Sequence, residues 1–269
     1  MALAHHRDEK LRFEQQVLNA EQDLLPFIQP YFHPSPLRRV LEIGCGEGGV
    51  LKPFLQRGCR AVGVELVAYR LQLAKSFLKD YLDNKQLELY CEDIYQVEPQ
   101  NLGSEAFHLI LLKDVIEHIP DQERLLGWLK QFLHPEGLVF IGFPPWYMPH
   151  GGHQQICEHK WLSLWPYLHL LPGRLYPSVL KWCGEQESTI QELMQVKSTG
   201  ISIERLERII RRQGYRIMRK QLYLINPIYR YKFGLRPVRQ LPVIRSIPYV
   251  RDFVTTCAYY LLQPMPSQP

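Results

Sequence analysis

The chain of 269 residues is long enough to bury one sizeable α/β core and to carry an insertion, which predicts a single elaborated domain rather than two independent ones. Hydrophobic residues make up 46% of the chain and charged residues 22%, which excludes a largely disordered protein. The net charge of +5 is uneven, because residues 1–172 carry −5 and residues 173–269 carry +10. This basic C-terminal third indicates either an anionic partner, such as a phospholipid headgroup or an acidic substrate, or a solvated surface.

The cysteines and the hydropathy pattern predict a cellular location. Six cysteines without a C-x-x-C pair are typical of reduced, mostly buried thiols in a cytoplasmic protein. The first 15 residues lack the apolar stretch of a signal peptide, and no window reaches the roughly 20 apolar residues that span a bilayer. We therefore expect a cytoplasmic protein that is at most peripheral to a membrane.

The first half of the chain alternates between strand and helix patterns. Residues 9–32 carry apolar side chains at helical spacing and predict a leading helix within an N-terminal segment, 1–35. Strands are expected at 39–44, 60–65, 87–91, 107–112 and 137–143, with helices at 50–57, 68–82 and 122–133. This alternation predicts a parallel, doubly wound α/β sheet as the core, residues 36–143.

The pattern changes after Phe143. Residues 144–199 are dense in Pro, Trp, Tyr, His and Leu, and we expect a largely helical insertion that serves as a substrate lid. Residues 200–269 return to the core with a helix at 201–213, a strand at 215–224 and a closing strand at 253–262. A basic and aromatic excursion, 226–250, separates these last two strands.

A glycine-rich turn follows the first predicted strand. Its glycines at 44, 46 and 49 satisfy the G-x-G-x-x-G pattern, which allows a tight turn and close approach of the backbone to a ligand. The helix that follows offers free N–H groups. Taken alone, this turn suits S-adenosylmethionine and a nicotinamide dinucleotide equally well.

Further motifs distinguish these two ligands. Glu42-x-Gly44-x-Gly46-x-Gly48 resembles the first motif of the class I S-adenosylmethionine-dependent methyltransferases. Three more motifs follow in the order of that family: Glu65 at the end of the second strand, Glu92-Asp93-Ile94 after the third, and residues 107–119 around the fourth. The last of these is similar to the fourth-strand motif of the branch that includes quinone-biosynthesis methyltransferases.

The resemblance implies S-adenosylmethionine as the cofactor. Glu65 would accept hydrogen bonds from the ribose hydroxyls, Asp93 would face the adenine amino group, and Ile94 would lie beside the ring. The residues assigned to cofactor binding are Glu42, Gly44, Cys45, Gly46, Glu65, Leu66, Asp93, Ile94, Lys113 and His118. The implied fold is a Rossmann-like, mostly parallel seven-stranded sheet with an antiparallel closing strand and the insertion after strand five.

The segment after the fifth strand supplies the candidate catalytic residue. A sulfonium donor needs a base only when the nucleophile arrives protonated. Among Tyr147, His150, His153, Glu158 and His159, we prefer His153 because it follows the flexible Gly151-Gly152 pair and a histidine titrates near neutrality. The alternative is a histidine that only forms hydrogen bonds within the lid. His150, His153, Cys157 and His159 lack a zinc-site spacing, so no metal is expected.

Three functions remain open at this point. The first is transfer of a methyl group from S-adenosylmethionine to a small-molecule or lipid-like acceptor, aromatic because of the aromatic residues at 146–167 or anionic because of the basic third. The second is a non-catalytic cofactor-binding protein that docks on a membrane or protein partner through the basic third. The third is an NAD(P)-dependent oxidoreductase. No nucleic-acid partner is expected, since no recognition fold is visible, and the sequence makes no prediction about oligomeric state.

Overall fold

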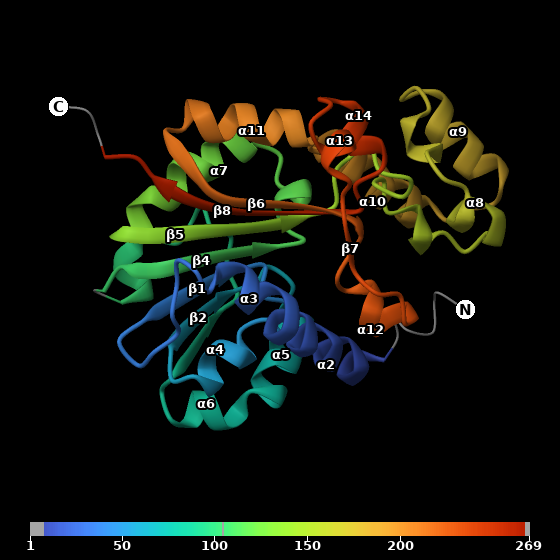
Figure 1. Ribbon diagram of the computed structural model, residues 1–269. Helices are drawn as coiled ribbons and strands as arrows, with labels where there is room; N and C mark the ends of the chain where they lie inside the picture. The colour runs from blue at the N-terminus through green and yellow to red at the C-terminus, as the bar shows by residue number, and fades with distance from the viewer. Residues whose placement is uncertain (1–7, 104, 267–269) are drawn as a thin grey trace.

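A single β-sheet forms the centre of the computed structural model, which describes residues 8–103 and 105–266. The strand order is β3-β2-β1-β4-β5-β8-β6-β7 (Figure 1). The strands are β1 Arg39–Ile43, β2 Arg60–Val64, β3 Leu87–Tyr90, β4 Phe107–Lys113, β5 Leu133–Phe143, β6 Tyr215–Ile225, β7 Val238–Arg239 and β8 Cys257–Pro264.

The direction of β8 confirms the predicted fold. Strands β1 to β5 pair in parallel, whereas β8 is antiparallel to both of its neighbours, β5 and β6. A two-halved dinucleotide-binding fold continues with parallel strands instead. The two-residue β7 pairs with the edge of β6 and makes the sheet eight-stranded rather than seven-stranded.

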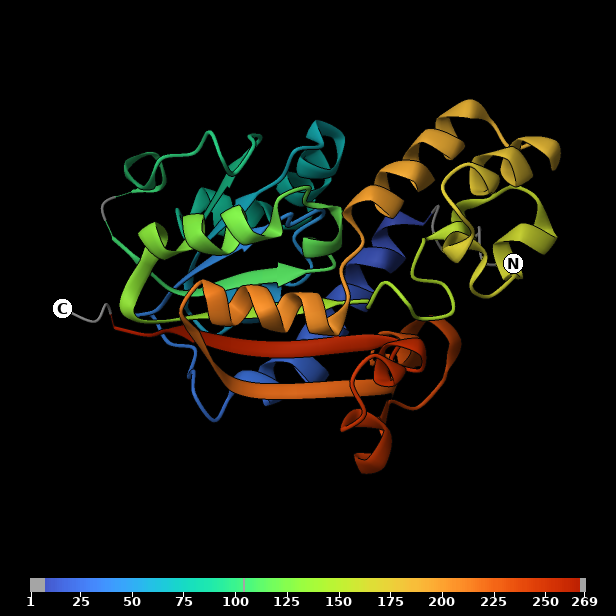
Figure 2. The same cartoon turned by 90° about the horizontal axis from the view of Figure 1, so that it is seen from above.

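Helices cover both faces of the sheet (Figures 1 and 2). One face packs against α7 and α11, and the other against the N-terminal helices together with α4 and α5. These elements are α2 Glu9–Asn19, the π-helix η1 Ala20–Leu24, α3 Leu25–Ile28, α4 Lys52–Gln56, α5 Ala68–Phe77, α6 Lys79–Asp83, α7 Gln122–Leu129 and α11 Ile203–Arg212. Short 3-10 turns are η2 Pro99–Leu102, η3 Ile116–His118 and η4 Lys130–Phe132.

Local sequence explains where these elements form and begin. All five residues of β1 are buried, as expected for a parallel strand that is covered on both faces. The Asp121 side chain accepts a hydrogen bond from Arg124 N at 2.9 Å and caps α7, and Ser202 caps α11 through Arg205 N at 3.1 Å.

The insertion after β5 has an apolar cluster of its own. It contains η5 Gln154–Ile156, α8 Lys160–Leu164, η6 Leu168–Leu170, α9 Leu175–Trp182 and α10 Glu187–Thr199. Figure 2 shows this segment beyond one end of the sheet, with α10 leading back towards α11. Buried side chains such as Tyr176 and Leu193 pack with one another there rather than with the sheet. The expected largely helical insertion is therefore present.

The excursion between β6 and β8 contains three short helices, α12 Tyr229–Phe233, α13 Pro242–Arg245 and α14 Val250–Phe253. Helix α12 lies beside α2 (Figure 1). The contact includes Gln15 Nε2, which donates to the carbonyl of Tyr231 at 3.0 Å, and the Tyr231 hydroxyl, which donates to Asp23 Oδ2 at 3.0 Å. The N-terminal helices and the excursion between β6 and β8 thus pack against each other.

Several element boundaries differ from the sequence-based expectation, and three of the differences follow from packing or strand register. The helix expected at 68–82 breaks at Leu78, whose buried side chain packs against Gly48. Strand β5 begins at Leu133 because a register shift against β4 accommodates residues 134–137, which were expected to form a turn. The closing strand begins at Cys257 rather than at residue 253, because residues 250–253 form α14 and its Asp252 accepts a hydrogen bond from Ile203 N at 3.1 Å.

Candidate cofactor and acceptor site

The glycine turn is held between β2 and the segment that follows β4. The backbone N–H groups of Gly44 and Cys45 donate to the carbonyl of Val64 at 2.8 and 3.2 Å. Gly44 has φ +67°, and a Cβ atom there would lie 2.5 Å from a methyl carbon of Val115. Both the left-handed backbone and the close approach therefore require glycine at this position.

Glu65 joins this turn to the end of β2. Its Oε2 accepts a hydrogen bond from Gly46 N at 2.8 Å, and its Oε1 accepts one from Val67 N at 2.9 Å. Each carboxylate oxygen can accept a further hydrogen bond. The carboxylate is thus fixed in place with acceptor capacity left for ribose hydroxyls, which fits the cofactor implied by the resemblance.

Glu42 is buried beneath the same turn. It is 2% exposed, and its Oε2 has no hydrogen-bond partner among the described residues. Burial, reinforced by the charge of nearby Glu65, holds the pKa of Glu42 well above its ordinary value. An unpaired buried carboxylate is costly unless a donor satisfies it. The amino group of S-adenosylmethionine is a donor of the required charge.

The residues expected near the adenine lie after β2 and β3. Asp93 is half-buried, and its Oδ1 accepts a hydrogen bond from Tyr95 N at 2.9 Å, while Leu66 is exposed. The Ile94 side chain packs in the core, and its carbonyl accepts a hydrogen bond from Trp128 Nε1 at 3.0 Å. Contact of these residues with an adenine ring stays a prediction.

The end of β4 carries two charged residues that pair with each other. Lys113 is buried, and its Nζ lies 2.5 Å from Oδ2 of Asp114 and 6.0 Å from the centre of the Tyr259 ring. Asp114 has φ +56°, an uncommon conformation for a residue other than glycine. The chain turns sharply at this point, and η3 begins two residues later.

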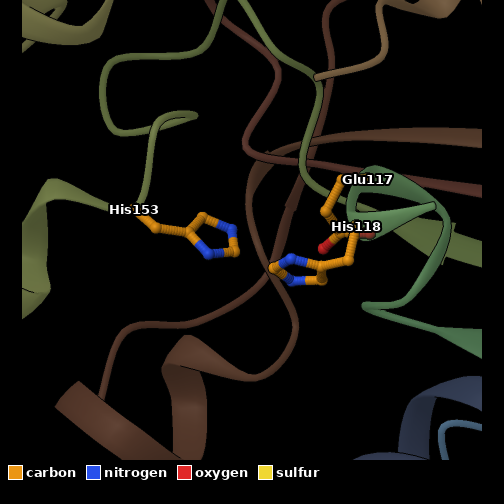
Figure 3. A group of neighbouring side chains, drawn as sticks. All are labelled: Glu117, His118 and His153. Carbon is orange, nitrogen blue, oxygen red and sulfur yellow. The ribbon is translucent and has the colours of Figure 1, made fainter. Parts of the chain in front are cut away.

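Three side chains converge beyond this turn. Figure 3 shows His153, from the insertion, pointing towards His118 and Glu117 of η3. The two imidazole rings have a T-shaped arrangement with centroids 5.0 Å apart. One nitrogen or oxygen atom from each of the three side chains lies within 4.8 Å of the others. Sequence analysis selected both histidines but missed Glu117, although it precedes His118 in the quoted fourth-strand motif.

The protonation states of this group follow from burial. Burial, reinforced by the neighbouring His118, lowers the pKa of His153 to about 4, which is below the near-neutral titration expected from the sequence. Burial also lowers the pKa of His118, whereas burial and the charge of Asp114 hold the pKa of Glu117 well above its ordinary value. Both imidazoles are therefore neutral at pH 7, and their lone pairs are available for a proton or a metal ion.

The insertion is attached to the core at both of its ends. Trp146 N donates to the carbonyl of Ile201 at 2.9 Å, and the Thr199 hydroxyl donates to the carbonyl of Glu117 at 2.6 Å. His153 has φ +57° and directly precedes η5. These contacts fix the segment that carries His153 relative to η3.

Cys157 and His159, which share the histidine- and cysteine-rich segment with His153, do not converge with it. Cys157 is buried in the apolar cluster of the insertion, and the His159 side chain is exposed. Tyr147 does not face η3 but stacks on Phe253 of α14, with ring centroids 5.3 Å apart. Within the described residues, the group that has the geometry of a metal site is instead the one formed with η3.

Comparisons with known proteins place this site in a family. A family model described as a methyltransferase domain matches residues 3–195. The chain is 32% identical over 103 residues to a ubiquinone biosynthesis O-methyltransferase of Bradyrhizobium sp. (strain ORS 278), which is 38% of this chain and 38% of that protein. It is 25% identical over 109 residues to the enzyme of the same name from Pasteurella multocida (strain Pm70), covering 39% and 45%. The matches thus span less than half the length of these relatives.

Solved structures show the same fold at low sequence identity. Geranyl diphosphate C-methyltransferase from Streptomyces coelicolor A3(2) superposes with a TM-score of 0.57 at 12% identity, over 98% of this chain and 82% of that one. Phosphoethanolamine N-methyltransferase 2 of Haemonchus contortus gives a TM-score of 0.57 at 16% identity, over 97% and 58%. Because the family model matches more than half of the chain, the protein belongs to the methyltransferase-domain family, and its fold is that of the class I S-adenosylmethionine-dependent methyltransferases.

Proposed function

We propose that the protein transfers a methyl group from S-adenosylmethionine to a hydroxyl group of a small ring-containing or lipid-like acceptor. The observation that carries this proposal is the position of the glycine turn, with Glu42 and Glu65, at the same end of the sheet as the group of Glu117, His118 and His153, in which Glu117 is buried and His118 is exposed. The glycine turn and its carboxylates offer hydrogen-bond partners to a cofactor. The imidazole nitrogens of His118 and His153 can accept a proton from an acceptor molecule. An O-methyltransferase function is also the one named for the curated relatives.

The cofactor supplies a methyl carbon that is made electrophilic by the attached sulfonium. The residues that would hold its methionine end and ribose are the fixed carboxylates Glu42 and Glu65 and the backbone of Gly44, Cys45 and Gly46. We assign its adenine to Asp93, Ile94 and Leu66, and the far side of its methionine end to Lys113 and His118. These residues bind and orient the donor, and close packing excludes water from the reacting atoms.

His153 is the proposed catalytic residue. A hydroxyl nucleophile must lose its proton, and the neutral imidazole of His153 can act on that oxygen either as a free base or through a bound cation. The reaction is tested by incubating the protein with methyl-labelled S-adenosylmethionine and a small-molecule extract, followed by mass spectrometry of the labelled products. We expect His153→Asn to lower product formation at least about 10²-fold, as for other groups that act on a proton.

A matched control makes this test specific. His159 lies six residues further along the same insertion and is exposed, so His159→Asn should leave product formation unchanged. Calorimetry with S-adenosylhomocysteine tests the cofactor assignment separately. A wild-type protein that binds neither form of the cofactor would refute the proposed function, whereas binding of the cofactor without any methyl transfer would support the alternative of a non-catalytic cofactor-binding protein.

We further propose that the excursion after β6 contacts an anionic lipid surface and that the protein is cytoplasmic. Exposed apolar residues are concentrated in this segment, including Phe233, Leu241 and Val243, and exposed arginines such as Arg236 and Arg245 lie among them. Among the described residues, no helix is long and apolar enough to cross a membrane. All six cysteines are free, which supports a reducing compartment.

Co-sedimentation with vesicles tests the lipid contact. We expect the protein to bind phosphatidylglycerol vesicles and to be released by salt, because basic residues near an anionic surface contribute about 1 kcal/mol each. The variant Val243→Glu should bind less, since it places a charge in the exposed apolar segment. Equal binding to phosphatidylcholine and phosphatidylglycerol vesicles would contradict the electrostatic part of this proposal.

A further inference from the structure

The side chains of Glu117, His118 and His153 are of types that bind metal ions, and the sequence did not predict that they lie together. Two of them come from η3 after β4, and the third comes from the insertion after β5 (Figure 3). Their ligand atoms lie within 4.8 Å of one another. Two imidazoles and one carboxylate are the protein ligands of many catalytic zinc sites.

Glu117 provides an independent indication that a ligand is bound here. Its side chain is 3% exposed, and neither of its carboxylate oxygens has a hydrogen-bond partner among the described residues. The nearby ammonium group of Lys113 is 2.5 Å from Asp114 and is therefore engaged elsewhere. A carboxylate buried in this way is costly unless it is protonated or coordinates a cation. A cation bound by its free oxygens removes that cost.

The two histidines have their ring nitrogens available. Within the described part of the chain, neither His118 nor His153 forms a side-chain hydrogen bond, and their rings contact each other edge to face. A neutral imidazole is the form that binds a metal ion. The backbone around them is well fixed, since the Thr199 hydroxyl donates to the carbonyl of Glu117 at 2.6 Å and Gln122 Nε2 donates to the carbonyl of Thr199 at the same distance.

We propose that Glu117, His118 and His153 bind one divalent first-row transition-metal ion, with a coordination position left open for the acceptor oxygen. Ligand atoms on a tetrahedral ion with bonds of about 2.0 Å are about 3.3 Å apart. Rotation of the exposed His118 side chain closes the remaining gap. The two imidazoles favour zinc, cobalt or iron over magnesium and calcium, which prefer oxygen ligands only.

Only the identity of the open-position ligand rests on the proposed function. An acceptor hydroxyl bound to the ion has a lowered pKa and releases its proton to water, so the oxygen becomes nucleophilic without a free base. In this arrangement His153 holds the ion.

Cobalt is the probe for this site. The full-length protein, stripped with a chelator and dialysed, is titrated with Co²⁺ and followed by visible absorption, because a tetrahedral Co²⁺ ion with nitrogen and oxygen ligands absorbs between about 500 and 650 nm and Zn²⁺ displaces it. We expect one ion per chain. The variants Glu117→Gln and His153→Asn should each weaken binding at least about tenfold, a loss at the lower end of that measured when even the outer partners of metal ligands are removed.

Matched controls make every outcome decisive. His159→Asn, in the same insertion but outside the group, should bind Co²⁺ like the wild type. Both Glu117→Gln and His153→Asn should keep their affinity for S-adenosylhomocysteine, which shows that they are folded. Absence of the Co²⁺ absorption, or unchanged Co²⁺ affinity in Glu117→Gln and His153→Asn, overturns the metal site without affecting the proposed methyl transfer. Co²⁺ binding without any affinity for S-adenosylhomocysteine refutes the proposed function and leaves the metal site standing.

Discussion

Replacement of Glu65 by Gln tests the cofactor site most directly, because it keeps the shape of the side chain and removes one acceptor. In the native protein the two carboxylate oxygens accept hydrogen bonds from Gly46 N at 2.8 Å and from Val67 N at 2.9 Å. A glutamine has only one oxygen, and its amide nitrogen then faces a backbone N–H as a second donor. One of the two backbone groups therefore loses its partner.

The expected loss follows from the hydrogen bonds that disappear. A hydrogen bond to a charged group contributes about 1.5–3 kcal/mol, and the variant also offers one acceptor fewer to the ribose hydroxyls. A loss of 1.5–3 kcal/mol in the binding free energy of the variant corresponds to a Kd for S-adenosylhomocysteine that is roughly 10- to 150-fold higher than that of the wild type. We expect thermal unfolding to shift downwards as well, because the turn at Gly46 loses an anchor.

Isothermal titration calorimetry with S-adenosylhomocysteine measures this effect. Glu98→Gln provides the matched control, since Glu98 is exposed, lies beyond β3 and forms no side-chain hydrogen bond among the described residues. The control should bind like the wild type. A Kd for Glu65→Gln within about twofold of the wild-type value would refute the assignment of Glu65 to the cofactor, whatever the stability of the variant.

Three further substitutions test the surroundings of the site. Gly44→Ala should destabilise the protein by roughly 2–4 kcal/mol in urea unfolding, since it combines a left-handed backbone with a 2.5 Å approach to Val115. Burial raises the pKa of Asp252 from 3.8 to about 7, so the folding stability that is present at low pH is lost as the pH rises towards 7. Asp252→Asn should therefore be more stable than the wild type by a few kcal/mol at pH 8 and equal to it near pH 4. Parallel curves of unfolding free energy against pH for the two proteins would contradict this. Thr199→Val removes the hydroxyl that donates to the Glu117 carbonyl and should cost about 1 kcal/mol in stability and speed hydrogen exchange in η3.

The sequence predicted the order of the core well, because its strands are continuous apolar runs that end at glycines, prolines or charged residues. Strand β1, for example, is buried along its whole length and is followed directly by Gly44. The boundaries that failed depend on contacts distant in sequence. The helix break at Leu78 accompanies packing against Gly48, and the late start of β8 accompanies the use of Asp252 at the beginning of α11.

The cofactor residues were predicted largely through a resemblance, and the acceptor side only in part. His153 was selected for its chemistry and its place after two glycines, while Glu117 was not singled out although the fourth-strand motif contains it. Its burial without a partner cannot be read from the sequence, because it depends on how Thr199 and the insertion close over η3. His153 instead meets residues of η3, a contact that depends on the path of the insertion and not on spacing along the chain.

The sheet topology explains why Glu117 and His153 meet at all. Strands β4 and β5 are parallel neighbours in a register that pairs Lys113 with Gly142, so the segments after them leave the sheet side by side. The insertion begins at the end of β5 and returns to the same end of the sheet. Near its two ends, Trp146 N donates a hydrogen bond to the carbonyl of Ile201, and the Thr199 hydroxyl donates one to the carbonyl of Glu117 in η3. The insertion is therefore constrained from outside at its ends and at Tyr167, whose hydroxyl donates to the carbonyl of Phe253 at 3.0 Å. Its remaining helices can change to fit a different acceptor while the reacting groups keep their positions.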